Sequence, residues 1–111
     1  MDDIILTPEL KAEIESQING SPVVLYMKGT PSQPMCGFSA RAVGVLNNLG
    51  VPFTGINILE RDDLRAGLKE YSEWPTFPQL YVKGDLIGGA DIMVEMYSSG
   101  ELADMLSDLA A

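Results

Sequence analysis

The chain has 111 residues, and its 16 aspartate and glutamate side chains outnumber 7 lysine and arginine side chains, which gives a formal net charge of −9. This length suits one compact domain, and we expect residues 1–111 to form it. The negative charge argues against nucleic acid or an anionic membrane surface as a partner. The chain has no histidine, so it cannot form a Ser-His-Asp triad. It has one cysteine, so one copy cannot form an internal disulfide or a four-cysteine metal site.

Neither a signal peptide nor a membrane span is predicted. The first residues, Met1-Asp2-Asp3, are acidic where a signal peptide would be basic. The longest apolar run, 23–27, is far too short to cross a bilayer. A single cysteine is typical of a reducing compartment. We therefore expect a cytoplasmic protein, with no membrane among its partners.

The beginning of the chain predicts a helix followed by a strand. Thr7-Pro8 is typical of a helix start, because threonine caps the first turn and proline suits the first helical position. Apolar residues then recur at four-residue spacing (Leu10, Ile14, Ile18) until Asn19-Gly20 ends the pattern. The β-branched apolar run 23–27 predicts a buried strand.

The middle of the chain predicts a helix, a strand and another helix. After a loop with two prolines, a helix begins near Cys36 and ends at about Asn48. The alternating segment 56–58 indicates a second strand. The next helix has apolar residues on one face, and we expect Asp62 or Asp63 to cap it.

The last third predicts a hairpin followed by two helices. Two apolar segments flank the turn 83–85, Asp91 is expected to cap a helix through Tyr97, and apolar spacing over 102–109 indicates a terminal helix. The early strand–helix–strand order implies a parallel crossover, and the hairpin adds antiparallel strands. We therefore predict an α/β fold, with a four-stranded mixed sheet flanked by helices.

The only cysteine lies in the only cationic part of the chain. Residues 21–50 contain Lys28, Arg41 and no acidic side chain. These are either two solvated bases placed by chance, or a positive potential that holds a thiolate or a small anionic thiol compound. Cys36 opens a predicted helix, where backbone N–H groups and the helix dipole lower a thiol pKa. The thiol is therefore a reactive group or, alternatively, a small buried hydrophobe.

Four sequence blocks carry a resemblance to a known family. Cys36-Gly37-Phe38-Ser39 resembles the active-site motif of monothiol glutaredoxins. Three other blocks follow that family's order and approximate spacing: Lys28-Gly29-Thr30-Pro31, Trp74-Pro75-Thr76-Phe77-Pro78-Gln79 and Gly88-Gly89-Ala90-Asp91. The resemblance covers roughly residues 10–108. It implies a thioredoxin fold with an extra N-terminal helix, and a cis peptide bond before Pro78.

The resemblance also implies a glutathione site. It assigns to Cys36 both the reaction with glutathione and the ligation of a [2Fe–2S] cluster. It implies five further contacts with glutathione: Lys28 beside the thiolate, Arg65 at a carboxylate, the Phe77 backbone along the tripeptide, and Ala90 and Asp91 at the γ-glutamyl end. The simpler alternatives are that Lys28 and Arg65 are solvated charges and that Asp91 only caps a helix.

The number of sulfur ligands that a [2Fe–2S] cluster needs implies that two chains share one cluster. A [2Fe–2S] cluster held by thiolates needs four of them, and each chain supplies one. Two chains and two glutathiones complete the set, so we expect a cluster-bridged homodimer that delivers the cluster to iron–sulfur apo-proteins.

Two alternative functions follow from the same motif. Ser39 stands where dithiol relatives carry a second cysteine. A glutathione-dependent thiol–disulfide oxidoreductase would therefore need a second glutathione to resolve its adduct, and we expect slow turnover. The other alternative is a regulatory interaction module that binds a BolA-type protein.

Overall fold

The computed structural model describes residues 5–109, which form a four-stranded mixed sheet with helices on both faces. The strand order is β2-β1-β3-β4, with β1 parallel to β2 and the other neighbouring pairs antiparallel. In chain order the elements are α1 (Pro8–Asn19), β1 (Val23–Met27), α2 (Gly37–Asn48), β2 (Thr54–Asn57), the 3₁₀-helix η1 (Ile58–Glu60), α3 (Asp62–Ser72), β3 (Gln79–Val82), β4 (Asp85–Gly88), α4 (Ala90–Ser99) and α5 (Glu101–Met105). No helix within the described residues is long and apolar enough to cross a membrane.

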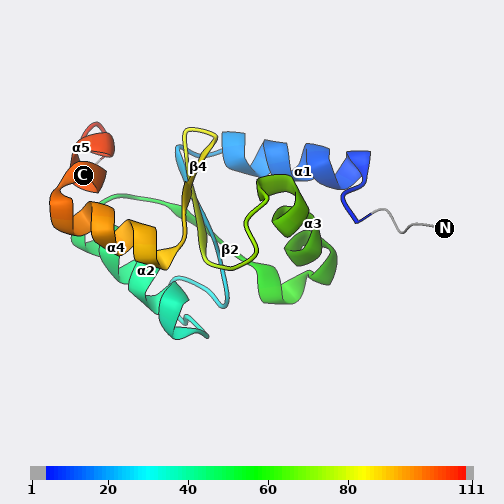
Figure 1. Cartoon of the computed structure of the whole chain (residues 1–111), viewed down its shortest axis with the longest axis horizontal. Helices are drawn as coiled ribbons and strands as arrows, with labels where there is room; N and C mark the ends of the chain where they lie inside the picture. Colours follow the sequence, from blue (N-terminus) through cyan, green and yellow to red (C-terminus); the bar gives the residue numbers. More distant parts are fainter. Residues whose placement is uncertain (1–4, 110–111) are drawn as a thin grey trace.

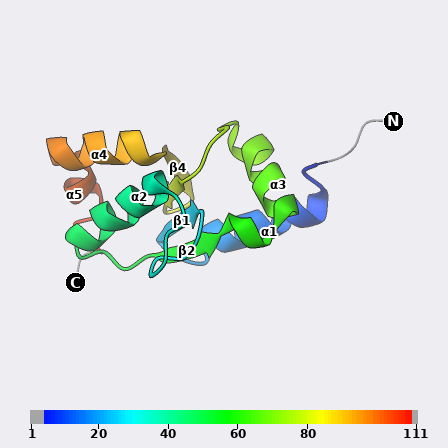
Figure 2. The same cartoon turned by 90° about the horizontal axis from the view of Figure 1, so that it is seen from below.

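Different helices cover the two faces of the sheet. Figures 1 and 2 show α2, α4 and α5 on one side of the sheet and α1 and α3 on the other. The central strand β1 serves both sides, because alternate residues of a strand point to opposite faces. Val23, Leu25 and Met27 join the apolar cluster beneath α2 and α4, and Val24 and Tyr26 join the cluster beneath α1 and α3. The predicted α/β architecture is confirmed. It is the thioredoxin fold with an additional N-terminal helix.

The N-terminal helix follows its sequence signals closely. Thr7 is the N-cap of α1, and its Oγ1 accepts a hydrogen bond of 3.1 Å from the backbone N–H of Leu10. The predicted apolar face is buried, with Leu10, Ile14 and Ile18 at most 5% exposed. Burying each such side chain contributes about 1.5–3 kcal/mol, so this face fixes α1 on the sheet.

The turn between β3 and β4 consists of two residues, Lys83 and Gly84. It is one residue shorter than predicted, because Asp85 already belongs to β4. Both turn residues have positive φ values, 51° for Lys83 and 87° for Gly84. Two successive positive φ values define a turn whose twist matches that of the flanking strands. The turn sends β4 back along β3 and delivers the start of α4 to the segment that precedes β3 (Figure 1).

Two predicted helix caps, Asp62 or Asp63 for α3 and Asp91 for α4, are not the N-caps of those helices. Asp62 and Asp63 lie in the first turn of α3, and Arg61 has the extended backbone of the N-cap. Asp91 likewise lies in the first turn of α4, where Gly89 is the N-cap. These predictions were wrong because an acidic side chain is also favourable inside a first turn, where it faces the positive end of the helix dipole.

Two element boundaries also differ from expectation. Ile58 does not continue β2 but begins η1, because the Asn57 side chain accepts a hydrogen bond of 3.0 Å from the Leu59 N–H and caps a tighter helix. The terminal helix is shorter than predicted and ends at Met105, whose side chain is 37% exposed. Leu102 and Leu106 still bury against the core.

Candidate functional site

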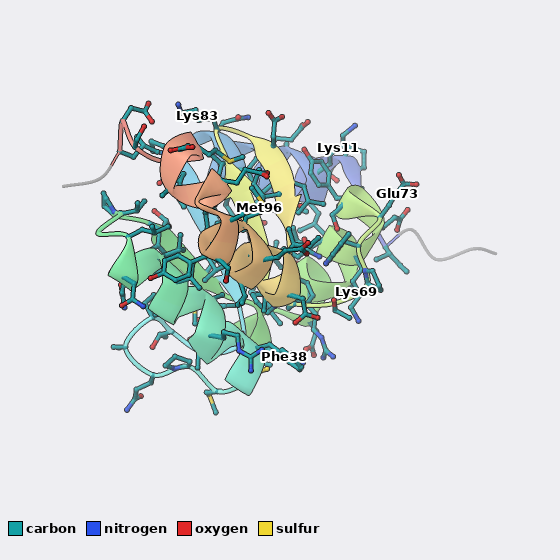
Figure 3. All side chains as sticks on the ribbon, turned by 60° about the vertical axis from the view of Figure 1, so that its left-hand side comes forward. Lys11, Phe38, Lys69, Glu73, Lys83 and Met96 are labelled. Carbon is teal, nitrogen blue, oxygen red and sulfur yellow. The ribbon has the colours of Figure 1, made fainter. Side chains whose placement is uncertain are left out.

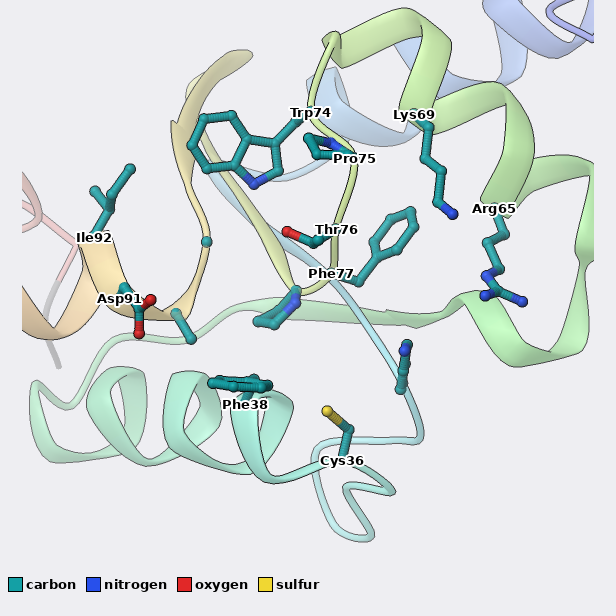
Figure 4. Close-up of a pocket in the computed structure, with 14 residues that line it drawn as sticks. Cys36, Phe38, Arg65, Lys69, Trp74, Pro75, Thr76, Phe77, Asp91 and Ile92 are labelled. Carbon is teal, nitrogen blue, oxygen red and sulfur yellow. The ribbon is translucent and has the colours of Figure 1, made fainter.

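A single cavity brings all the predicted site residues together. It has a volume of about 530 Å³ and lies between the start of α2, the segment 74–78, one face of α3 and the start of α4 (Figure 4). Its lining includes each residue that the sequence analysis assigned to a site: Lys28, Cys36, Arg65, Phe77, Ala90 and Asp91. These residues are far apart in the sequence, so the fold alone places them around one space.

Cys36 occupies the N-cap position of α2, and its thiol points into the cavity (Figure 4). The backbone N–H of Ser39 has the largest effect on this thiol and lowers its pKa, against the opposing effect of burial. The backbone N–H of Phe38 and the charge of Lys28 lower the pKa of Cys36 further. A half-buried thiol at a helix start does not fit the alternative of a small buried hydrophobe, and its lowered pKa favours the thiolate form.

The end of β1 is tied to the start of α2 through the backbone of Lys28. The N–H of Lys28 donates to Ser39 Oγ at 3.0 Å, and the Lys28 carbonyl accepts from the N–H of Met35 at 2.9 Å. The connecting loop is compact: a Cβ at Gly29, where φ is 93°, would lie 2.5 Å from the carbonyl oxygen of Gln33. These contacts hold the Lys28 backbone and the Cys36 thiol in a fixed relation.

Two exposed apolar residues, Met35 and Phe38, flank Cys36 in the sequence and are here called the apolar rim. Met35 is 71% exposed and Phe38 is 54% exposed, and Phe38 also lines the cavity. Exposed large apolar side chains beside a site are typical of a contact surface. The thiol therefore opens onto a surface suited to a partner molecule.

The opposite side of the cavity is the segment Trp74-Pro75-Thr76-Phe77-Pro78, here called the turn 74–78. The peptide bond between Phe77 and Pro78 is cis, as the resemblance implied. The turn packs closely on the start of α4. A Cβ at Gly89 would lie 3.3 Å from the Pro78 carbonyl oxygen and 3.4 Å from Trp74 Nε1. Figure 4 shows the Trp74 ring closing one end of the cavity.

Charges of opposite sign stand at opposite ends of the cavity. Arg65 and Lys69 lie at one end and Asp91 at the other (Figure 4), and Lys28 also lines the cavity. Arg65 Nε is buried and has no hydrogen-bond partner among the described residues. Such a donor fits an anionic group of a ligand, because a buried polar group is costly unless it is paired.

Sequence reasoning missed Lys69 and treated Trp74 mainly as a packing residue. Lys69 follows Arg65 by four residues on α3, so both side chains project from the same face of the helix. That spacing was the available signal for Lys69. Trp74 carried a weaker signal, because its place in the cavity depends on how the turn 74–78 folds against α4.

A thioredoxin fold with one cysteine of lowered pKa at the start of a helix, facing a cis-proline turn, defines a class of thiol proteins. A family model described as Glutaredoxin matches residues 23–87. The chain belongs to the glutaredoxin family and, within it, to the monothiol glutaredoxins.

Two relatives illustrate the match. The chain is 57% identical to "Monothiol glutaredoxin-S14, chloroplastic" of Arabidopsis thaliana over 89% of its own length, but it spans only 57% of that protein. It is 52% identical to "Glutaredoxin 4" of Pasteurella multocida, with 89% of this chain and 91% of the relative covered.

Solved structures agree with this assignment. Reduced apo GrxS14 of poplar has a TM-score of 0.82 and 51% sequence identity, over 96% of this chain and 97% of that chain. A buckwheat glutaredoxin–glutathione complex has a TM-score of 0.81 and 26% identity, over 95% of this chain and 99% of that chain.

Proposed function

We propose that the chain binds glutathione in the cavity beside Cys36, and that two chains use this site to hold a [2Fe–2S] cluster for delivery to iron–sulfur apo-proteins. The observation that carries the proposal is the cavity itself. A thiol of lowered pKa lies between a cationic end and an anionic end of one space. The buckwheat relative, whose structure is a complex with glutathione, supports the same ligand.

The charges of glutathione match those of the cavity. Glutathione has two carboxylates and one ammonium group. Lys28 and Arg65 would bind the glycine carboxylate, while Asp91 would bind the γ-glutamyl ammonium group at the other end. The γ-glutamyl carboxylate would accept from N–H groups at the start of α4, where Ala90 lies, because a helix N-terminus favours an anion.

The cysteine of glutathione then lies between the two ends, next to Cys36. The Phe77 backbone borders the same space and would pair with the extended tripeptide. This arrangement places two sulfur atoms side by side, one from the protein and one from the ligand.

One chain cannot supply a complete set of cluster ligands. No group of three or more His, Cys, Asp or Glu side chains able to hold a metal ion occurs in residues 5–109. A thiolate-held [2Fe–2S] cluster needs four sulfur ligands. Cys36 from each of two chains and one glutathione on each chain make four. The apolar rim of Met35 and Phe38 would then lie at the contact between the two chains.

Anaerobic reconstitution tests the carrier function. The apo-protein is mixed with iron and sulfide, with and without glutathione, and then analysed by size-exclusion chromatography with iron, sulfide and glutathione assays. We expect a coloured dimer with one cluster and two glutathiones, only when glutathione is present. Cys36→Ser is expected to give a colourless monomer. A coloured monomer, or a cluster retained by Cys36→Ser, would contradict the ligand assignment.

The lowered pKa of Cys36 also supports a second candidate, a glutathione-dependent oxidoreductase. The Cys36 thiolate would attack the glutathione sulfur of a mixed disulfide, form a Cys36–glutathione disulfide and release the substrate thiolate. A second glutathione thiolate would attack that adduct, which yields glutathione disulfide and restores Cys36. Ser39 offers no thiol for this step. Fast turnover by a protein that forms no cluster would favour this candidate.

The proposed function also includes an alternative partner protein and a cellular compartment. The apolar rim beside Cys36 would also suit a BolA-type protein in place of the second chain. A single thiol whose chemistry depends on glutathione suits a reducing compartment, and we propose the cytoplasm.

A further inference from the structure

Gln79 is a fully buried amide directly behind the turn 74–78. It is the first residue of β3, lies opposite Tyr26 of β1 and is 0% exposed. Among the described residues, Ser39 is the only other polar side chain buried to this extent. A buried amide is costly unless its hydrogen bonds are satisfied, so its partners indicate its role.

The side-chain NH₂ group of Gln79 donates both of its hydrogen bonds to carbonyl oxygens of the turn. Gln79 Nε2 donates to the carbonyl oxygen of Trp74 at 3.1 Å and to that of Thr76 at 3.3 Å. On its other side, Oε1 accepts from the Tyr81 hydroxyl at 3.2 Å. Burial raises the pKa of Tyr81 to about 12, so this hydroxyl remains a donor at neutral pH. The two N–H groups of the amide therefore hold two carbonyls of the turn, while its oxygen faces the sheet.

The turn 74–78 makes few other hydrogen bonds. Its backbone takes no part in the backbone–backbone hydrogen bonds found among the described loops and turns. Ser72 Oγ accepts from the Trp74 N–H at 3.1 Å and donates to the Trp74 carbonyl oxygen at 3.5 Å, but these contacts fix only the first residue of the turn. The opposite side of the turn lines the cavity, whereas Gln79 does not (Figure 4).

We propose that Gln79 is a positioning residue for glutathione: its amide fixes the Trp74 and Thr76 carbonyls and thereby orients the Phe77 backbone toward the ligand. This inference rests on the proposed glutathione site and adds to it a residue that does not touch the ligand. Without the amide, the Thr76 carbonyl loses its donor, the Trp74 carbonyl keeps only the longer contact of 3.5 Å from Ser72 Oγ, and the turn gains freedom. Ligand binding then has to order the turn, which weakens affinity.

The main variant is Gln79→Met, which keeps the length and burial of the side chain and removes its hydrogen bonds. We expect glutathione affinity, measured by calorimetry, to fall by about tenfold or more, the loss that goes with one or two hydrogen bonds. Trp74 is the only tryptophan in the chain, so its fluorescence reports on the turn directly. We expect lower anisotropy in the variant without ligand. The rate of Cys36 alkylation should stay within about twofold of the parent, because the thiol lies on the other side of the cavity.

Tyr81→Phe is the matched control. It removes the hydroxyl on the far side of the same amide and leaves both bonds to the turn. We expect a small loss of stability, with glutathione affinity within about twofold of the parent. A tenfold loss of affinity in this control would mean that general packing, rather than the bonds to the turn, sets binding, and would overturn the inference.

The outcomes separate this inference from the proposed function. A parent protein that does not bind glutathione overturns the proposed function and this role with it. A parent that binds, together with a folded Gln79→Met that binds equally well and has unchanged Trp74 anisotropy, overturns this inference alone.

If Gln79→Met does not fold, the shorter amide of Gln79→Asn and a measurement on the parent replace it. Hydrogen exchange of the Gln79 side-chain amide, followed by NMR, should be much slower than that of the exposed Gln33. Equal exchange rates would show that the amide does not hold the turn and would overturn the proposal.

Discussion

Charged side chains are arranged differently in the cavity and at the seam between α1 and α3. At the seam, Arg61 donates two hydrogen bonds of 2.9 Å to the Glu13 carboxylate and two more, of 2.8 Å and 2.9 Å, to the Asp63 carboxylate. In the cavity, neither Arg65 nor Asp91 has a salt-bridge partner among the described residues. The charges at the seam are already satisfied within the fold, whereas those in the cavity are available to a ligand.

The difference separates two kinds of expected effect. Removing a charge from the cavity should change ligand binding and leave folding almost unaffected. Removing a charge from the seam should change stability and leave binding unaffected. Each prediction below tests one side of this contrast.

The largest effect is expected for Arg65→Glu, which reverses the charge at the cationic end of the cavity. A hydrogen bond between charged groups contributes roughly 1.5–3 kcal/mol, so glutathione affinity should fall by roughly 10- to 150-fold. The control is Arg41→Glu, because Arg41 is exposed on α2 outside the cavity lining. Calorimetry compares the affinities, and circular dichroism checks folding. Equal affinity in the two variants would mean that Arg65 is only a surface charge.

Asp91→Asn should have the next largest effect, because it removes the negative charge while keeping the shape of the side chain. We expect glutathione to bind about tenfold more weakly, which corresponds to the loss of about 1.4 kcal/mol. Asp62→Asn is the matched control, since Asp62 also lies in the first turn of a helix but does not line the cavity. If both variants lose affinity equally, the effect of Asp91 comes from helix stability rather than from the ligand.

Lys28→Gln should raise the pKa of the Cys36 thiol only part of the way toward the ~8.5 of free cysteine. The backbone N–H of Ser39 has a larger effect than Lys28 on this pKa, and the substitution leaves it in place. The pH dependence of Cys36 alkylation measures the midpoint. A parent midpoint at or above that of free cysteine would remove the electrostatic argument for a reactive thiol.

The smallest effect is expected at the seam, where Arg61→Gln should lower stability without changing glutathione affinity. The Arg61 guanidinium lowers the pKa of Asp63 to about 2 and also lowers the pKa of Glu13. A carboxylate whose pKa is lower in the folded state stabilises the fold above its unfolded pKa, and this contribution is lost as pH falls through the folded value. The difference in Tm between parent and variant should therefore shrink between about pH 4 and pH 2. A difference that stays constant with pH would contradict this account.

The sequence determined most local elements of the structure. The helix Pro8–Asn19 follows from Thr7, Pro8 and three apolar residues in register, because capping and burial act within one or two turns. The sequence also identified six residues of the cavity, but four of these assignments depended on motif resemblance rather than on spacing: Arg65, Phe77, Ala90 and Asp91. Nothing in their local patterns places these four beside Cys36.

Only the tertiary structure decided how those elements meet. The position of a helix cap depends on the backbone angles of one residue, and an acidic residue is favourable either at the cap or in the first turn. The sequence therefore predicted Asp62 and Asp91 at the N-caps, whereas both lie in the first turn of their helices. Lys69 joins the cavity because α3 turns that face toward the thiol. Gln79 became buried because β3 lies at the centre of the sheet, between β1 and β4, where its amide can reach the turn 74–78. Local sequence sets the preferences of each segment, whereas burial and hydrogen-bond partners depend on segments distant in the chain.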